Sequence, residues 1–390
     1  MLKNIKKTFV NMDKTILFTS IFLIVFGTLN IVTASSREAA VNLDTNVYYY
    51  FFRHIIILFI SLIAFLIIIR IKTKDYGKLA PIALWGVLAL NLALIIWGAA
   101  TRGANNWINL GFFKLQPSEL AKPTLIVCLS LLIEKYYNKL EEKQEKNPAI
   151  IWTITILGLI FPVIVFWQKD LGTATILIFV FLTLFFATPI KFKRKIQTLT
   201  IVGILGILVI TCITSFTGPL LSDAQMARFN YLNPCSKYVS GEGYQVCNAY
   251  IAINNGGLMG LGLGNSIQKY SYIPEPHTDM VFSIIAEENG VIKCSLIFLA
   301  YLIILFRILK LSIKTTKISH RYICLGIATY IFSHILINLG GLFGLIPLTG
   351  VPLPFLSYGG SFTISLIATL AIVQRIHLEY KLEKQKTKNQ

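Results

Sequence analysis

Charged residues are scarce in this 390-residue chain. They make up 14% of the sequence, whereas 55% of the residues are hydrophobic and the mean hydropathy is +0.67. Soluble globular domains carry about 25% charged residues, so this composition excludes a chain of ordinary soluble domains. No long polar domain, repeat array or low-complexity tract interrupts the apolar sequence. The composition therefore predicts a protein embedded in a membrane.

Acidic residues are the scarcer charge type, with 18 Asp and Glu against 36 Lys and Arg and a net charge of +18. The basic residues do not form one patch with interleaved aromatic residues, so nucleic acid is not an expected partner. Instead, 26 of the 36 fall in six short segments between apolar stretches. Cytoplasmic loops of membrane proteins are enriched in this way. Both ends of the chain, about 1–14 and 377–390, are therefore predicted to be cytoplasmic tails.

Cysteine and histidine are also few, six and five residues, and their spacing matches no structural zinc site. No structural metal is therefore assigned. Four cysteines lie in apolar stretches, where a small thiol is an ordinary packing residue; they are Cys128, Cys212, Cys294 and Cys324. Cys235 and Cys247 lie in an outer loop, where an oxidising compartment would permit a disulfide. The sequence does not decide whether that bridge forms.

Apolar stretches of about 20 residues are long enough to cross a bilayer as helices. Ten are found, at about 15–34, 52–70, 79–100, 118–135, 149–167, 173–188, 198–217, 280–306, 322–345 and 360–376. The predicted fold is all-α: a single polytopic membrane domain over residues 1–390 with about ten transmembrane helices. A large extracytoplasmic loop, about 218–279, separates the seventh and eighth helices.

Irregular sequence collects on the outer side of this topology. The loop at 218–279 contains a glycine run from Gly256 to Gly264, and loops of this length are usually functional. The Gly-x-Gly-x-Gly pattern follows no strand, so a nucleotide-binding fold is not expected. Close approach of the backbone to a ligand or to another helix is the better explanation.

Five ionisable residues fall at membrane depth, where charge is costly; they are Glu119, Lys122, Glu287, Glu288 and Lys293. We expect all five to face the bundle interior or a wet cavity. Glu119 and Lys122 are three residues apart, so they lie on one helix face and form one polar unit. This unit is either a self-neutralising structural pair or part of a functional site.

Asp170 and Asp279 each stand just before a predicted span. An acid at that position complements the helix N-terminus, so capping is the default explanation for both. The segment from Pro352 to Ser361 cannot continue as a helix. Irregular backbone at membrane depth either is buried in protein or lines a cavity, and the sequence favours neither.

Five motifs occur together along the chain, from Gln116 to Ser361. They are Gln116 to Lys122 (QPSELAK), Asp170 to Thr173 (DLGT), Gly243 to Gln245 (GYQ), Gly256 to Asp279 (GGLMGLGLGNSIQKYSYIPEPHTD) and Pro352 to Ser361 (PLPFLSYGGS). Together they resemble the SEDS family of FtsW, RodA and SpoVE, and the wider similarity extends from roughly the first span to the tenth, in matching order. Two departures are Asn106, where the family usually has arginine, and Lys169, where proline is commonest. The stretch from Asn265 to Glu275 looks more like the division-type members than the elongation-type RodA.

The resemblance implies a glycosyltransferase that polymerises lipid II into glycan strands on the outer face of a bacterial inner membrane, at the division septum. The implied partners are a class B penicillin-binding transpeptidase and other division proteins. Asp279 matches the family's essential acid, here a general base. Trp107, Glu119 and Lys122 match residues around an outer cavity, and further motif positions are matched by Gln116, Arg228, Gln245, Gln268 and His277. A loosely bound Mg²⁺ or Mn²⁺, with ligands unknown, would act with Lys122 on the pyrophosphate.

Three alternatives remain open: a flippase or other transporter, a scaffold for division proteins, and a RodA-like elongation polymerase. Buried charges and broken helices are also what a translocation pathway contains. However, a pathway should place ionisable residues along its inner half as well, whereas here they collect on the outer face. That asymmetry favours catalysis.

Overall fold

The computed structural model describes residues 8–97, 99–101, 104–109, 114–142, 148–217, 234–237, 242–270, 273 and 275–388. Within these ranges every predicted span coincides with a helix. The helices are α2 (Lys14–Arg37), α3 (Tyr49–Ile68), α4 (Tyr76–Trp97), α5 (Pro117–Glu142), α6 (Pro148–Trp167), α7 (Leu171–Ala187), α8 (Phe192–Thr217), α11 (Val281–Lys314), α12 (Ile318–Leu342) and α13 (Gly360–Lys388). In the described part of the chain, eight are long and apolar enough to cross a membrane. The other two do not meet these criteria, because α5 carries several charged residues and α7 has only 17 residues. The predicted polytopic all-α fold is confirmed.

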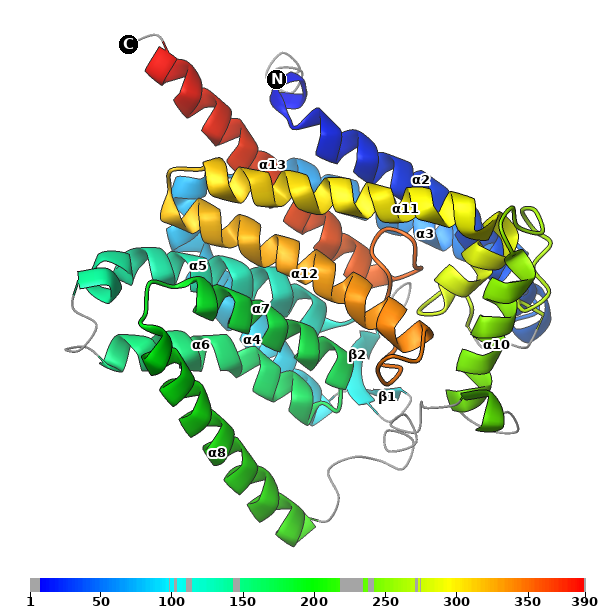
Figure 1. The fold of residues 1–390 in the computed structure, drawn as a ribbon, viewed down its shortest axis with the longest axis horizontal. Coiled ribbons are helices and arrows are strands. Elements are labelled where there is room, and N and C mark those ends of the chain that lie inside the picture. The colour runs from blue at the N-terminus through cyan, green and yellow to red at the C-terminus, as the bar shows by residue number, and fades with distance from the viewer. Residues whose placement is uncertain are drawn as a thin grey trace.

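The helices form one bundle, with α12 near its centre. α12 packs against α5, α7 and α11, α13 packs against α3 and α5, and α11 also contacts α2. α8 projects away from the bundle and is largely exposed (Figure 1). The start of α2 and the end of α13 lie toward one end of the bundle, and α10 (Glu242–Gly256) and the short strands lie toward the other (Figure 1). Because both described ends lie at the same end of the bundle, the fold is consistent with an even number of membrane crossings.

A three-stranded antiparallel sheet follows α4 and was not predicted. It consists of β1 (Ala99–Thr101), β2 (Ala104–Asn109) and β3 (Lys114–Leu115). Trp107 of β2 pairs with Ala99, and Ile108 pairs with Leu115. Strands this short have no periodicity that a sequence can reveal. The sheet holds Asn106 and Trp107 next to the start of α5.

Besides a helical turn at residues 8–11, three short helical elements are described. They are the π-helix η1 (Glu38–Asn42) and the 3₁₀ turns η2 (Thr73–Asp75) and η3 (Pro234–Lys237). A disulfide joins Cys235 of η3 to Cys247 of α10, so the bridge that the sequence left open is present. α10 lies within the segment expected to be a long outer loop. At the other end of the chain, α13 continues to Lys388, so the predicted tail at 377–390 is mostly helical.

α11 is broken at Gly290, whose φ of 73° and ψ of 173° are not helical. The glycine-rich segment after α10 supplies the missing backbone partners: Leu261 N donates to Glu287 O at 2.9 Å, and Val291 N donates to Gly257 O at 3.0 Å. A Cβ at Gly260 would collide with the carbonyl of Glu288. The glycine run therefore allows close approach to another helix, as the sequence predicted.

The break also decides which charges are buried. Glu287 and Glu288, before Gly290, are fully buried; Glu287 accepts from Ser266 Oγ, and Glu288 lies 3.4 Å from Lys269 Nζ. Lys293, after the break, is exposed, so the prediction that it faces the interior was wrong. Beyond Gly290 the buried residues of α11 follow a spacing of three or four, and Lys293 is not on that stripe.

Candidate active site

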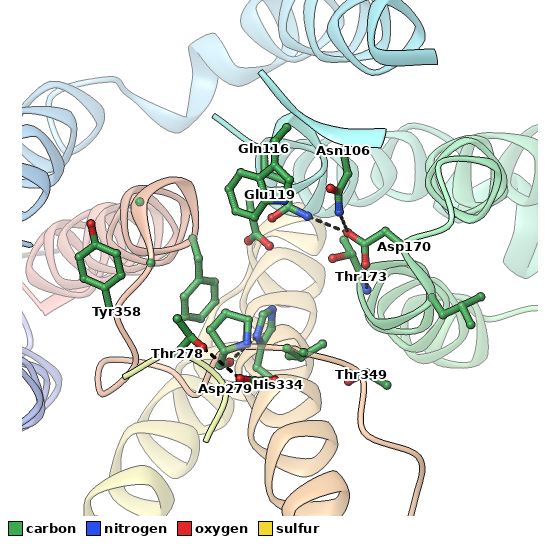
Figure 2. Close-up of a pocket in the computed structure, with 18 of the residues that line it drawn as sticks. Asn106, Gln116, Glu119, Asp170, Thr173, Thr278, Asp279, His334, Thr349 and Tyr358 are labelled. Carbon is green, nitrogen blue, oxygen red and sulfur yellow. Dashed lines mark hydrogen bonds between the residues drawn. The ribbon is translucent and has the colours of Figure 1, made fainter. Parts of the chain in front are cut away.

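A cavity of about 240 Å³ lies where α5, α7 and α12 meet the segment before α11 and the loop before α13. Asn106, Gln116, Glu119 and Asp170 lie on one side of it, and Thr278, Asp279 and His334 lie on another (Figure 2). Of the residues expected at the site, the lining includes Trp107, Gln116, Glu119 and Asp279. The structure thus brings together residues separated by more than 170 positions in the sequence.

Asp170 has two roles in this cavity. Its Oδ1 accepts from Thr173 N at 3.0 Å, which caps α7 as the sequence predicted. Its Oδ2 accepts from Gln116 Nε2 at 2.7 Å and from Asn106 Nδ2 at 3.1 Å. Both donors to Oδ2 among the described residues are therefore neutral amides.

Glu119 and Lys122 form the predicted polar unit, with Lys122 Nζ 2.7 Å from Glu119 Oε1. Only Glu119 lines the cavity; Lys122 is fully buried behind it. The second oxygen, Oε2, is buried and has no hydrogen-bond partner among the described residues. A buried carboxylate oxygen without a partner is costly, and this one belongs to a residue that lines the cavity. The pair therefore presents an acceptor there, while the lysine neutralises it from behind.

His334 of α12 was not anticipated from the sequence. Its Nε2 lies 3.0 Å from Lys122 Nζ, and its Nδ1 lies 3.1 Å from Pro352 O. A carbonyl only accepts, so Nδ1 carries the hydrogen and Nε2 accepts from the lysine. Lys122 is enclosed further by the rings of Tyr330 and Phe362, with centroids 5.7 and 5.8 Å from Nζ. The sequence did not predict this role, because the contact depends on how α12 packs against α5.

Asp279 does not cap α11. The N-cap is Met280, and no side chain caps this helix, so the default explanation from sequence was wrong for Asp279. Its Oδ1 accepts from Thr278 Oγ1 at 3.0 Å, and its backbone carbonyl accepts from Asn338 Nδ2 at 2.7 Å. The backbone is thus fixed to α12, and the carboxylate faces the cavity (Figure 2).

The loop between α12 and α13 both packs and lines the cavity, so the two alternatives for Pro352–Ser361 are both realised. Leu353 and Leu356 are fully buried, whereas Pro352, Tyr358 and Gly359 line the cavity. Burial raises the pKa of the Tyr358 phenol, although a hydrogen bond from Arg53 opposes the shift. The phenol is therefore neutral at physiological pH and is able to donate a hydrogen bond.

The other expected site residues lie elsewhere. Gln245 is on α10, and Gln268 is buried with its backbone N 3.2 Å from Glu287 Oε2. His277 is buried beside the outer end of α3, with its ring centroid 4.2 Å from that of Tyr50 and its Nδ1 3.3 Å from Glu38 Oε2. None of these three lines the cavity. Arg228 lies outside the described residues.

Carboxylates outnumber cations around the cavity. Among the described residues, the charged side chains that line it are Glu119, Asp170, Glu275, Asp279 and Lys169. No group of three or more His, Cys, Asp or Glu in the described chain is arranged to hold a metal ion by itself. Mg²⁺ usually binds through one or two carboxylates together with substrate phosphates. The carboxylates that line the cavity supply oxygens of the kind that such an ion binds.

The fold and this cavity define a polytopic α-helical membrane protein with an acid-lined site at one end of its bundle. The family model for FtsW, RodA and SpoVE, described as cell cycle protein, matches residues 14–382. The chain belongs to this family.

Two curated relatives from Bacillus subtilis strain 168 illustrate the relationship. The protein named "Probable peptidoglycan glycosyltransferase FtsW" is 31% identical over 390 residues, which cover 99% of this chain and 95% of that protein. Stage V sporulation protein E is 31% identical over 365 residues, with coverages of 91% and 94%.

Solved structures share the fold. A chain of a peptidoglycan synthase complex matches with a TM-score of 0.72 at 23% identity, covering 95% of this chain and 98% of that one. RodA of Thermus thermophilus matches with a TM-score of 0.66 at 21% identity, with coverages of 94% and 96%.

Proposed function

We propose that this protein is a peptidoglycan glycosyltransferase that polymerises lipid II, with Asp279 as its general base. The observation that carries the proposal is the position of Asp279: it lines the cavity and does not cap α11. Relatives named as FtsW glycosyltransferases match almost the whole chain. Because those relatives and a sporulation protein are division-type members, septal synthesis is favoured over elongation.

In the proposed reaction, the 4-hydroxyl of an acceptor GlcNAc attacks the anomeric carbon of a donor MurNAc. The Asp279 carboxylate accepts the hydroxyl proton as the new glycosidic bond forms, and undecaprenyl pyrophosphate departs. General-base catalysis of this kind contributes ~10²- to 10⁴-fold. Thr278, which donates to Asp279 Oδ1, orients the carboxylate. Tyr358 also lines the cavity, and its phenol is hydrogen-bonded to Arg53.

The departing pyrophosphate is anionic, yet the lining is mainly acidic. Lys122 cannot reach it directly, because its Nζ is buried and held by Glu119 and His334. We therefore assign Lys122 to positioning Glu119. A Mg²⁺ or Mn²⁺ ion, when bound, would provide the positive charge that neutralises the pyrophosphate. Glu119 is the residue proposed to hold it, so that Asp279 stays free to accept the proton.

The proposed location is the bacterial inner membrane, at the septum, with both termini cytoplasmic and the cavity on the outer face. The proposed partners are lipid II, a nascent glycan strand, a class B penicillin-binding transpeptidase and other division proteins. The clustering of basic residues supports this orientation. Reporters fused near residues 143 and 193 should behave as cytoplasmic, and one near residue 240 as periplasmic. A cytoplasmic signal at 240 would overturn the orientation.

The decisive experiment uses purified full-length protein with lipid II and Mg²⁺ or Mn²⁺, with and without its transpeptidase. Glycan polymer, separated on a gel, is the expected product in at least one of these mixtures. Reconstitution into vesicles with labelled lipid II provides the comparison for a flippase. Translocation of the label without polymer in any mixture would show that the protein is a transporter and not a glycosyltransferase. If neither translocation nor polymer is observed, the scaffold alternative is favoured.

A further inference from the structure

A second cavity, distant from the active site, opens along the membrane-facing side of the bundle. It is an apolar groove of about 270 Å³ between α2, α3 and α13. Ile21 and Leu62 line it, and 46% and 49% of their side chains are exposed. The groove is therefore open laterally to the hydrocarbon of a bilayer, and is not a sealed packing defect.

A third cavity, of about 250 Å³, lies next to the groove toward the cytoplasmic end of α13. Because Thr8, Asn11, Lys381 and Gln385 line it beside two leucines, we call it the polar cavity. The two share one face of α13: Leu370 and Gln374 line the groove, and Leu378, Lys381 and Gln385 line the polar cavity. These positions are three or four residues apart, so they form one stripe along the helix. The helical turn at residues 8–11 borders both cavities.

The charges around the polar cavity are arranged so that positive charge faces it. Glu379 and Glu383 of the same helix segment point toward Lys317, whose Nζ lies 3.9 and 3.2 Å from them. Arg375 is neutralised by Glu379 at 2.8 Å. In the described part of the chain, Lys381 makes no ion pair, and its side chain lines the cavity. An anionic group in this cavity would therefore meet a cation that is not already engaged in an ion pair with a described residue.

We propose that the groove and the polar cavity together bind one anionic glycerophospholipid. An acyl chain would occupy the apolar groove, and the phosphate would lie beside Lys381 at the membrane surface. Juxtamembrane basic residues attract anionic headgroups in this way. The bound lipid would hold the turn at residues 8–11 against α13. With the proposed orientation, the lipid belongs to the cytoplasmic leaflet.

The test is native mass spectrometry of the full-length protein in detergent, titrated with dioleoylphosphatidylglycerol or with dioleoylphosphatidylcholine. One phosphatidylglycerol should bind more tightly than phosphatidylcholine. Lys381→Gln should weaken that binding about fivefold, the effect of one basic residue at an anionic lipid. Lys384→Gln is the matched control, because Lys384 is exposed on the same helix but does not line the cavity.

A second pair of variants tests the groove without changing charge. Leu62→Trp fills the mouth of the groove and should weaken binding of both lipids. Leu302→Trp places the same side chain on an exposed site of α11, outside the groove, and should leave lipid binding unchanged. Equal binding of the two lipids, or equal effects of Lys381→Gln and Lys384→Gln, would overturn the proposal. So would a protein that retains no lipid and forms dimers through this groove. These measurements need no lipid II, so their outcome is separate from that of the polymerisation assay.

Discussion

His334 Nε2 lies 3.0 Å from Lys122 Nζ, and both side chains are fully buried at the base of the acid-lined cavity. The contact joins α12 to α5 and completes a chain from Pro352 through His334 and Lys122 to Glu119. One end of this chain is the irregular loop, and the other end is the unpartnered Glu119 Oε2. The cavity wall thus depends on a neutral histidine.

The His334 contact predicts different effects for two buried histidines. His334→Phe removes the acceptor for Lys122, and a lost hydrogen bond to a charged group costs roughly 1.5–3 kcal/mol. We expect a lower melting temperature and reduced glycan polymerisation. His54→Phe is the control, because His54 is buried and neither of its ring nitrogens has a hydrogen-bond partner among the described residues. Equal effects of the two substitutions on melting temperature and activity would show that the contact is unimportant.

The Glu119–Lys122 pair allows its structural and functional contributions to be separated. Glu119→Gln leaves the buried Lys122 charge without its carboxylate partner, and Lys122→Met leaves the buried Glu119 charge without its lysine. Each substitution should therefore destabilise the protein by roughly 3–5 kcal/mol. The double variant removes both charges and should recover most of the stability. Polymerisation should remain impaired in the double variant, because the cavity has lost the negative charge of Glu119. Recovery of activity along with stability would make the pair purely structural.

Gly290 predicts a backbone effect. Its conformation, φ 73° and ψ 173°, is essentially restricted to glycine, and a Cβ would also collide with the backbone at Gly260. Gly290→Ala should therefore destabilise the protein by at least ~1–3 kcal/mol. Gly86→Ala, within α4 where an added Cβ meets nothing, should instead stabilise by ~0.5–1 kcal/mol. Thermal unfolding of both variants in detergent provides the comparison, and a harmless Gly290→Ala would contradict the described break.

The parts of the fold that the sequence predicted are those governed by local rules. All ten spans follow from the length of apolar stretches, and the Glu119–Lys122 pair follows from a three-residue spacing on one helix. The wrong prediction for Lys293 has a physical cause, because burial on one side of the break at Gly290 does not continue on the other. Only the three-dimensional structure reveals where α11 loses its helical backbone.

The sequence predicted only those site residues that lie in a recognisable motif. Asp170 and Asp279 have the same local context, an acid before a span, yet only Asp170 is a cap. The difference arises because the turn before α11 makes Met280 the N-cap. His334 gave no signal, because its contact depends on how α12 meets α5. Asn106 stood out only as a departure from the family's usual arginine, because the strand that carries it is too short to be predicted.

Asp279→Asn tests the central claim most directly. Asparagine retains an oxygen that can accept from Thr278, and the residue is not a helix cap, so the variant should fold normally and show an unchanged melting temperature. It cannot accept a proton at neutral pH. The measurement is glycan polymerisation by this variant with lipid II and divalent metal, compared with wild type. We predict a loss of ~10²- to 10⁴-fold; near-normal polymer from the folded variant would remove Asp279 from the catalytic role.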